Sequence, residues 1–245
     1  MKFVFTGNTN TGMVRTANQD SYYYDEDGRF FIVADGMGGH AGGEKASSIA
    51  TEKIKFCLNE YWNNIQTDNE KLIQDAFEQA NKGILNDQHQ NPQRSDMGTT
   101  AVVLMYRNDE YFYGNVGDSR LYSFRNGKLT QITEDQTWVA RALKIGDLTK
   151  KQAKNHPWRH VLSQCLGRKE LNVKNLEINK LKDVQINDRF LLCSDGLTEE
   201  VDDSIIESAL VNYSTPEEVI NNLIQEALES GGSDNVTVIV IDVKD

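Results

Sequence analysis

The sequence is poor in cysteine and has no long apolar run, and each shortage excludes a class of protein. Its three cysteines, Cys57, Cys165 and Cys193, are widely spaced, odd in number and without a Cys-X-X-Cys pair. That pattern is typical of buried thiols in a reducing compartment and not of a disulfide framework or a zinc cluster. No apolar run approaches the roughly 20 residues of a transmembrane helix, and no basic and then apolar leader precedes the first predicted strand. We therefore expect a soluble, cytoplasmic protein.

The chain also lacks an excess of basic side chains. Its 37 acidic and 26 basic residues give a formal net charge of −11. This charge would repel a nucleic acid or an anionic membrane, so neither is an expected partner. At 245 residues the chain is long enough for one large domain with a substantial core. We expect a monomer with a single domain over residues 1–245.

Aspartates with a glycine one or two residues away recur at the ends of strongly apolar segments, after three of them and before a fourth. Four aspartates share this position: Asp35 after residues 30–34, Asp118 after 111–116, Asp195 after 190–194, and Asp234 before 236–243. A single Asp-Gly pair is usually only a turn. If the four strands lie side by side, however, their carboxylates converge, and divalent cations can neutralise such a cluster without protonating it. The pattern therefore indicates a metal site.

Two glycine-rich stretches look like nucleotide-binding loops but do not fit them. Residues 7–12 open like a phosphate-binding P-loop, but Met13 and Val14 stand where Lys and Ser or Thr would be needed. Residues 36–41 fit a loose dinucleotide fingerprint, yet two helical stretches follow where a second strand is required. We reject both interpretations. Arg15 could hold a phosphate bidentately, although an exposed arginine is more often a solvated surface residue.

The hydrophobic periodicity predicts strands and helices in alternating groups. Strands are predicted at residues 2–6, 20–24, 30–34, 99–106, 111–116, 120–125, 129–132, 173–181, 189–193 and 236–243. Helices are predicted at residues 44–62, 69–90, 203–210 and 217–228. Short turns between strands indicate antiparallel hairpins. This order favours an α+β sandwich of two mostly antiparallel sheets with a helical pair on each outer face.

Residues 134–157 interrupt the strands with a polar, mostly helical stretch. Two interpretations stay open: a lid or substrate guide beside a site, or a small helical excursion that only packs on the sheet. His156 and His160 are four residues apart, as zinc ligands can be, but Pro157 lies between them and no Glu or Cys joins the set. We interpret both histidines as structural.

Taken together, the motifs resemble those of the type 2C metal-dependent protein phosphatases, the PPM family, in their compact bacterial form. The resemblance spans nearly the whole chain. It rests on Arg15, on Asn18 to Asp20, and on the segments VADGMGGHAGGEKAS, DMGTTAV, VGDSRLY, LLCSDGLTEE and GGSDNVTVIVI. It is closest to cyanobacterial members that act on the phosphorylated PII signalling protein. The resemblance implies an α-β-β-α sandwich, hydrolysis of phosphoserine and phosphothreonine in proteins, and a flap at about residues 134–160.

The resemblance also implies which residues form the site. The implied metal ligands are Asp35, the carbonyl of Gly36, Asp118, Asp195 and Asp234, with Asp118 and Asp195 at a third ion, while Asp20 orders water and Arg15 binds phosphate. Oxygen ligands without His or Cys indicate hard cations, Mg²⁺ or Mn²⁺. Two such ions can lower the pKa of a bridging water, so that a hydroxide attacks phosphorus directly without a covalent enzyme intermediate. Arg15 would offset charge in the transition state.

One position departs from the family pattern. Some members carry a His directly after the first Asp-Gly, proposed as a general acid, but here that residue is Met37, whose thioether cannot donate a proton. Nearby His40 could act as an acid, contact the substrate or make a structural hydrogen bond. The alternative function is a non-catalytic phosphoprotein-binding or partner-switching module of the same fold, whose hallmark would be a lost ligand. A small-molecule phosphoesterase is a third candidate.

Overall fold

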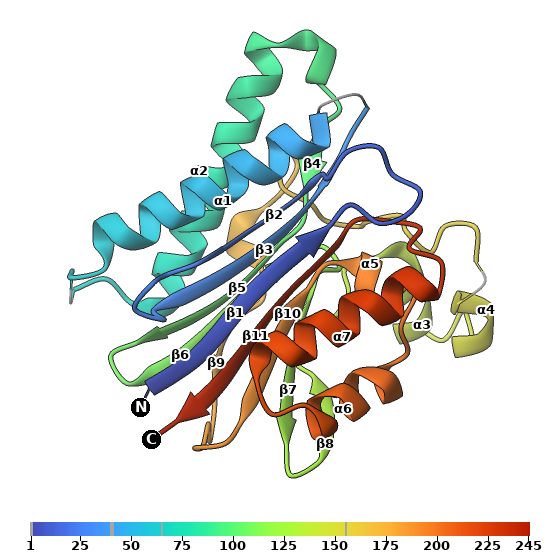
Figure 1. The fold of residues 1–245 in the computed structure, drawn as a ribbon. Helices are drawn as coiled ribbons and strands as arrows, with labels where there is room; N and C mark the ends of the chain where they lie inside the picture. Colours follow the sequence, from blue (N-terminus) through green and yellow to red (C-terminus); the bar gives the residue numbers. More distant parts are fainter. Residues whose placement is uncertain (1, 40–41, 65, 155) are drawn as a thin grey trace.

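The computed structural model describes residues 2–39, 42–64, 66–154 and 156–245, which form two stacked β-sheets (Figure 1). The first sheet has the order β1 (Lys2–Asn10), β11 (Val236–Lys244), β10 (Arg189–Cys193), β7 (Arg120–Arg125) and β8 (Lys128–Gln131). The second has the order β2 (Asp20–Tyr24), β3 (Phe30–Met37), β5 (Ala101–Arg107), β6 (Glu110–Val116) and β9 (Ile178–Leu181), with β4 (Gly98–Thr99) beside β3. All the described strand pairs are antiparallel.

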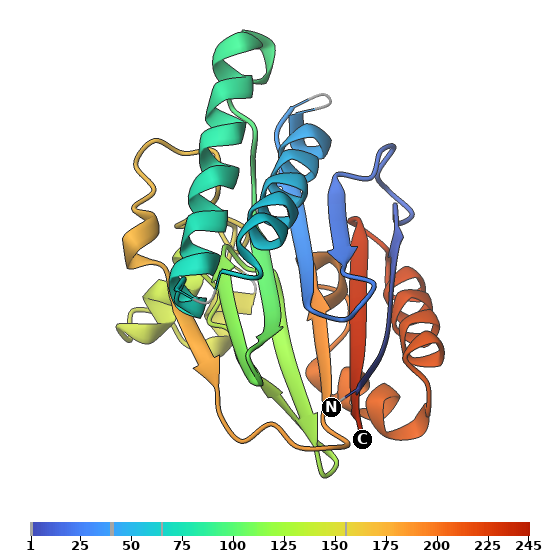
Figure 2. The same cartoon turned by 90° about the vertical axis from the view of Figure 1, so that its left-hand side faces the viewer.

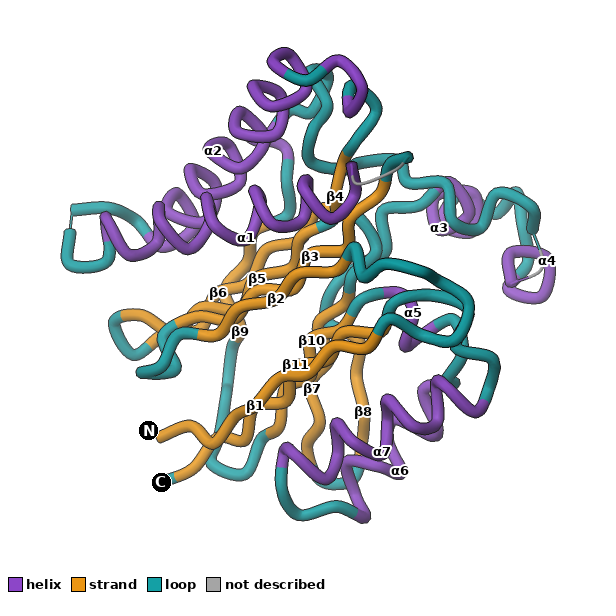
Figure 3. The backbone as a smooth tube through the Cα atoms, turned by 45° about the horizontal axis from the view of Figure 1, so that its top comes forward, coloured by secondary structure: helices purple, strands orange, loops and turns teal. Residues whose placement is uncertain are grey.

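Helices cover the outer face of each sheet (Figure 2). The second sheet carries α1 (Gly42–Tyr61) and α2 (Asn69–Gln90), and the first carries α6 (Asp203–Asn212) and α7 (Pro216–Glu229). Three short helices, α3 (Trp138–Lys144), α4 (Lys150–Lys154) and α5 (Asp195–Thr198), gather at one end of the strands (Figure 3). In the part of the chain that the structure describes, no helix has the length and apolar character needed to cross a membrane.

The core consists of three apolar layers that follow from strand alternation. In β3, Phe30 and Ile32 face α1 and α2, whereas Phe31 and Val33 face the other sheet. Strand β11 alternates in the same way. Val236, Val238 and Val240 pack against α7, whereas Ile239, Ile241 and Val243 lie between the sheets. Both strands are buried on both faces, which explains their near-continuous apolar sequences. The predicted α+β sandwich with a helical pair on each side is confirmed.

The structure differs from the predicted elements mainly where local signals are weak. The strand predicted at residues 173–181 begins only at Ile178, because Val173–Asn175 forms a 3-10 turn. Strand β1 continues through residues 7–10, which the sequence placed in a polar loop, because they pair with β11. The four-residue helix α5 was not predicted. The stretch at 134–157 is helical as expected, with α3 and α4.

Candidate active site

Five aspartates meet at the end of the sandwich that lies away from the chain termini (Figure 1). Asp20 begins β2 and pairs directly with Asp35 near the end of β3. Asp118 follows β6, Asp195 follows β10, and Asp234 precedes β11. Because antiparallel neighbours run in opposite directions, the starts of β2 and β11 lie beside the ends of β3, β6 and β10. The structure thus brings together aspartates that are far apart in the sequence.

A cleft of about 490 Å³ opens over this cluster. Asp35, Asp118, Asp195 and Asp234 line it, together with Arg15. The backbone of Asp35 is fixed from two sides, because its N–H donates to Thr100 Oγ1 at 2.9 Å and its carbonyl accepts from Thr99 Oγ1 at 2.8 Å. The carboxylate of Asp35 is therefore held at the floor of the cleft by the sheet itself.

The carboxylates of the cluster cannot all be ionised without a compensating charge. Burial raises the pKa of Asp35 well above its usual range, and the neighbouring charges of Asp20 and Asp195 raise it further. Burial also raises the pKa of Asp118 and of Asp195, and repulsion from nearby carboxylates raises both pKa values further. Like charges in a site of low polarity favour protonated carboxyls or a bound cation.

Asp20 presents one satisfied and one unsatisfied oxygen. Its Oδ2 accepts hydrogen bonds from Thr237 Oγ1 at 2.6 Å and from Ser194 Oγ at 2.7 Å. Its Oδ1 is buried and has no hydrogen-bond partner among the described residues. Burial raises the pKa of Asp20 to about 7. A buried oxygen of this kind calls for a donor from outside the chain, such as an ordered water.

The residues present fit a hard divalent cation. The acidic residues that line the cleft offer carboxylate oxygens, and Gly36 belongs to the same lining. A Cβ at Gly36 would lie 2.0 Å from the carbonyl oxygen of Gly43, so only glycine permits this close backbone approach. Oxygen donors with net negative charge match Mg²⁺ or Mn²⁺.

Arg15 reaches the cluster from the loop between β1 and β2. Its Nη2 forms an ion pair with Asp234 Oδ2 at 2.6 Å, and about half of its side chain is exposed. Asn235 anchors this loop, because its Nδ2 donates to the carbonyls of Thr11 at 2.9 Å and Ala17 at 3.0 Å. The sequence did not single out Asn235, since an Asn after an Asp in a turn carries no special signal.

His160 and Glu199 are cleft residues that the sequence analysis did not identify. His160 Nδ1 lies 3.1 Å from Glu199 Oε1, and both side chains line the cleft. One ligand atom from each, and one from Asp195, lie within 4.8 Å of one another. The interpretation of His160 as structural stays a prediction, although the turn after α5 supplies a carboxylate that no neighbour of His160 in the sequence offers. His156 instead stacks on Trp138.

Two further sequence predictions concern the segment after Asp35. Met37 lines the cleft at the position where some relatives of the predicted family carry a histidine. His40 lies outside the described residues, so its predicted role in acid catalysis or substrate contact stays a prediction.

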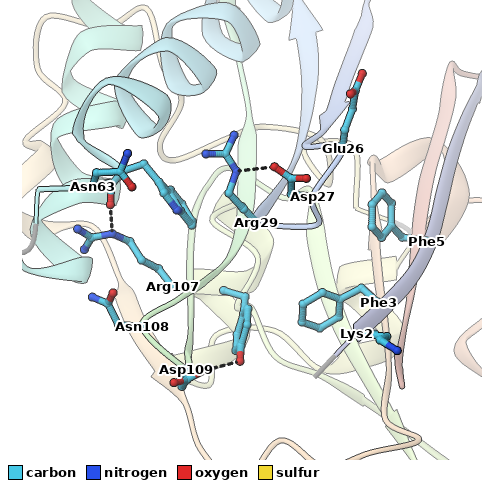
Figure 4. A pocket seen from close by; sticks show the side chains of 12 residues that line it. Lys2, Phe3, Phe5, Glu26, Asp27, Arg29, Asn63, Arg107, Asn108 and Asp109 are labelled. Carbon is cyan, nitrogen blue, oxygen red and sulfur yellow. Dashed lines mark hydrogen bonds and ion pairs between the residues drawn. The ribbon is translucent and has the colours of Figure 1, made fainter. Parts of the chain in front are cut away.

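A hollow at the opposite end of the strands has a different character (Figure 4). Its two arginines are already committed to the fold. Arg107 donates to the carbonyl of Asn64 at 2.7 Å and to Asn69 Oδ1 at 2.6 Å, and so holds the loop between α1 and α2. Arg29 forms an ion pair with Asp25 at 2.6 Å. We therefore place the candidate site at the aspartate cluster.

The molecule closely matches known bacterial phosphatases. Serine/threonine protein phosphatase PstP of Mycobacterium tuberculosis is 34% identical over 245 residues, which span 98% of this chain but 45% of PstP. The serine/threonine phosphatase Stp of Listeria monocytogenes is 33% identical over 239 residues, which span 96% of this chain and 93% of Stp. The crystal structure of M. tuberculosis PstP has a TM-score of 0.90 at 32% identity and covers 99% of both chains.

One of the related structures contains metal ions. A crystal structure of the PstP catalytic domain in complex with two manganese ions has a TM-score of 0.85 at 31% identity and covers 99% of both chains. The model of the family described as protein phosphatase 2C matches residues 13–231, most of the sequence. This chain therefore belongs to the protein phosphatase 2C family.

Proposed function

We propose that this chain is a metal-dependent protein serine/threonine phosphatase that hydrolyses phosphoserine and phosphothreonine. The observation that carries the proposal is the buried group of Asp35, Asp118 and Asp195, whose burial, together with repulsion from nearby carboxylates, raises their pKa values, beneath a cleft that also contains Arg15. The carboxylates of the cleft floor and the phosphate ester both carry negative charge. The ester could therefore reach the floor only if cations offset the charges of both. The two manganese ions of the related PstP structure support the same conclusion.

The candidate ligands have separate roles in this proposal. Asp35, the Gly36 carbonyl, Asp195 and Asp234 would hold two ions, and Asp118 with Asp195 would hold a third. When bound, Mg²⁺ or Mn²⁺ supplies a water of lowered pKa as the nucleophile and neutralises charge on the phosphate. The buried Oδ1 of Asp20 can accept a hydrogen bond from water and so orient it.

Arg15 is the proposed phosphate-binding residue. Its guanidinium is half-exposed and pairs with Asp234 at 2.6 Å, so it stands at the mouth of the cleft and not in the core. A guanidinium forms paired hydrogen bonds to phosphate oxygens and offsets charge that develops on them. We propose that Arg15 exchanges part of its contact with Asp234 for the substrate phosphate.

We further propose a cytoplasmic monomer, with residues 1–245 as one catalytic domain and the flap at 134–160 as its subdomain. The phosphorylated PII signalling protein is a candidate substrate, on the sequence resemblance alone. It can be tested with serine-phosphorylated PII and an unrelated phosphoprotein at equal concentrations. Release of phosphate from PII at the same rate as from the unrelated protein would exclude a dedicated role.

The proposed activity is tested with an aryl phosphate and a phosphothreonine peptide in Mn²⁺. Phosphate release from both is expected, with nearly complete loss in Asp35→Asn and retention in Asp27→Asn, which alters an exposed carboxylate at the far end of the strands. Full activity of Asp35→Asn would contradict the proposal. Stoichiometric binding of the peptide without turnover would instead favour the alternative, a phosphoprotein-binding module.

A further inference from the structure

Three rings on the flap, Trp138, His156 and Trp158, form what we call the ring cluster. Trp138 and His156 stack with their centroids 4.8 Å apart, and Trp158 meets them edge-on at 5.2 and 5.8 Å. These contacts would suit a small apolar core. Yet Trp158 is 54% exposed and Trp138 is 37% exposed. Exposed aromatic residues that already contact one another are typical of binding surfaces.

The ring cluster is continuous with the rim of the active-site cleft. Arg159, His160 and Leu162, which follow Trp158 in the chain, all line that cleft. The backbone N–H of Trp138 donates to the carbonyl of Val161 at 2.8 Å, so α3 is joined to the same rim segment. A ligand that occupies the cleft and extends over this rim would meet the rings.

Ion pairs hold the flap in place against the body of the protein. Arg159 Nε lies 3.5 Å from a carboxylate oxygen of Glu199 in the turn after α5, and Lys154 Nζ lies 3.1 Å from Asp202, the residue before α6. Residues 138–160 contain six Lys or Arg and one acidic residue, a net charge of +5 in a chain of net charge −11. The rings thus lie on a basic segment that contacts two carboxylates of the body, Glu199 and Asp202.

A second exposed apolar pair lies on the loop that carries Arg15, a residue of the cleft lining. Met13 is 71% exposed and Val14 is 67% exposed. The loop is fixed there, because the Met13 N–H donates to the carbonyl of Gly232 at 2.7 Å. Exposed apolar side chains therefore occur on two separate segments that also carry cleft residues, whereas the cleft itself is lined by charged residues such as Asp35 and Asp195.

We propose that the ring cluster is a docking surface for an apolar side chain next to the phosphorylated residue of a protein substrate. This inference rests on the proposed phosphatase function and names its substrate class. A protein substrate places its phosphoresidue on the cleft floor, and its neighbouring residues must then cross the rim. A small aryl phosphate occupies the floor alone and has no segment that reaches the rings. The rings therefore discriminate between protein substrates and do not act on the phosphate.

The test compares three substrates: an aryl phosphate, a phosphothreonine peptide flanked by Leu on both sides, and the same peptide flanked by Ser. We expect Trp158→Ala to lower kcat/KM for the Leu peptide, relative to the aryl phosphate, by about ten-fold and chiefly through KM, as loss of a buried tryptophan contact does at interfaces. Trp158→Phe should retain part of the preference for Leu. Phe56→Ala, which removes a 60% exposed ring on α1, should leave the ratio as in the wild type.

Several results would overturn the proposal. The wild type could show no preference for the Leu peptide, or Trp158→Ala could lower the rates for all three substrates equally, which would make the rings structural. A change of sedimentation coefficient in Trp158→Ala without a change in the ratio would assign the rings to contact between two copies of the chain. If the wild type hydrolysed no substrate in Mn²⁺, the phosphatase proposal itself would fail. Calorimetric binding of the two peptides would then still test the ring cluster.

Discussion

Single hydroxyl groups determine how Asp20 faces the candidate site. Thr237 and Ser194 both donate to Oδ2, which leaves Oδ1 as the buried oxygen directed to a partner from outside the chain. Because the one proton of Thr237 goes to Asp20, Thr9 must donate to Thr237 across their 2.7 Å contact. A side chain that the sequence shows only as one more Thr in an apolar strand thus positions a carboxylate of the site.

Removal of the Thr237 hydroxyl should weaken the metal site without changing its ligands. We expect Thr237→Val to lower Mn²⁺ affinity by about 10- to 100-fold, the usual effect of losing a hydrogen bond that orients a group around a metal site. Thr237→Ser keeps the hydroxyl and should restore most of the affinity. Thr9→Val is the matched control, since it removes a hydroxyl that does not contact Asp20. Calorimetric affinities that are equal in the Val and Ser variants would refute this role.

Asp35→Asn should change stability in opposite directions with and without metal. In the metal-free protein the substitution removes a buried carboxyl from a crowded cluster, and we expect a gain of about 1–3 kcal/mol in the free energy of unfolding. Manganese should then no longer stabilise the fold. Urea unfolding in chelator and in Mn²⁺ measures both effects. A less stable metal-free variant, or one that Mn²⁺ stabilises as it does the wild type, would show that repulsion does not dominate.

At the scale of elements, a buried arginine joins α6 to the first sheet. Arg189 in β10 donates to Asp242 in β11 at 2.7 Å, and to the carbonyls of Leu210 and Tyr213 at 2.8 Å each. The two carbonyls belong to the last turn of α6 and to its C-cap residue, so one side chain binds the end of a helix to two strands. The side chains of Arg189 and Asp242 are almost fully buried.

Loss of this arginine should leave Asp242 buried with an incomplete set of partners. We expect Arg189→Met to lower the free energy of unfolding by about 3–5 kcal/mol, as happens when one member of a buried ion pair is removed. The double variant Arg189→Met with Asp242→Leu should recover much of that loss. Urea unfolding at equal protein concentration makes the comparison. A single variant as stable as the wild type would contradict the assigned role.

The sequence predicted elements well where both ends carry a signal. Helix α2 and strands β7 and β10 have the predicted bounds, because a periodic apolar stretch is flanked by turn or cap residues in each case. Residues 173–177 were predicted as the start of a strand, but Val173–Asn175 forms a 3-10 turn, since tertiary position overrides a weak local preference. Four of the aspartates could be found because Asp35, Asp118 and Asp195 lie at or just after the end of an apolar strand and Asp234 lies just before the start of one. Glu199 and His160 could not, because their contact joins two distant segments that carry no shared motif.

For the whole molecule, the carboxylate cluster couples stability to pH. The folded-state pKa of Asp20 is about 7 against an ordinary value of 3.8, and burial also raises the pKa values of Asp35, Asp118 and Asp195. Between a pH of 3.8 and a pH of about 7, the folded chain therefore binds more protons than the unfolded chain. Such a group favours folding at low pH, and its contribution is lost as pH rises through the folded pKa.

The metal-free protein should consequently become less stable against unfolding as the pH rises from about 5 to about 7.5. The manganese-loaded protein should not, because the cations bind the ionised carboxylates. Carboxylates with lowered pKa values, such as Asp25 and Glu218, lose their stabilising effect only as pH falls below their ordinary range, outside this interval. Urea midpoints in chelator and in Mn²⁺ at the two pH values test the prediction. A metal-free midpoint that rises with pH would contradict it.

We infer that strand ends far apart in the sequence bring Asp35, Asp195 and Asp234 together to hold a pair of hard cations. Anomalous diffraction from crystals grown with Mn²⁺ tests it most directly, because the signal locates manganese independently of any assumed ligand. We expect two strong anomalous peaks bounded by Asp35, Asp195 and Asp234. A map without manganese among these three carboxylates, or with manganese bound only elsewhere on the molecule, would contradict it.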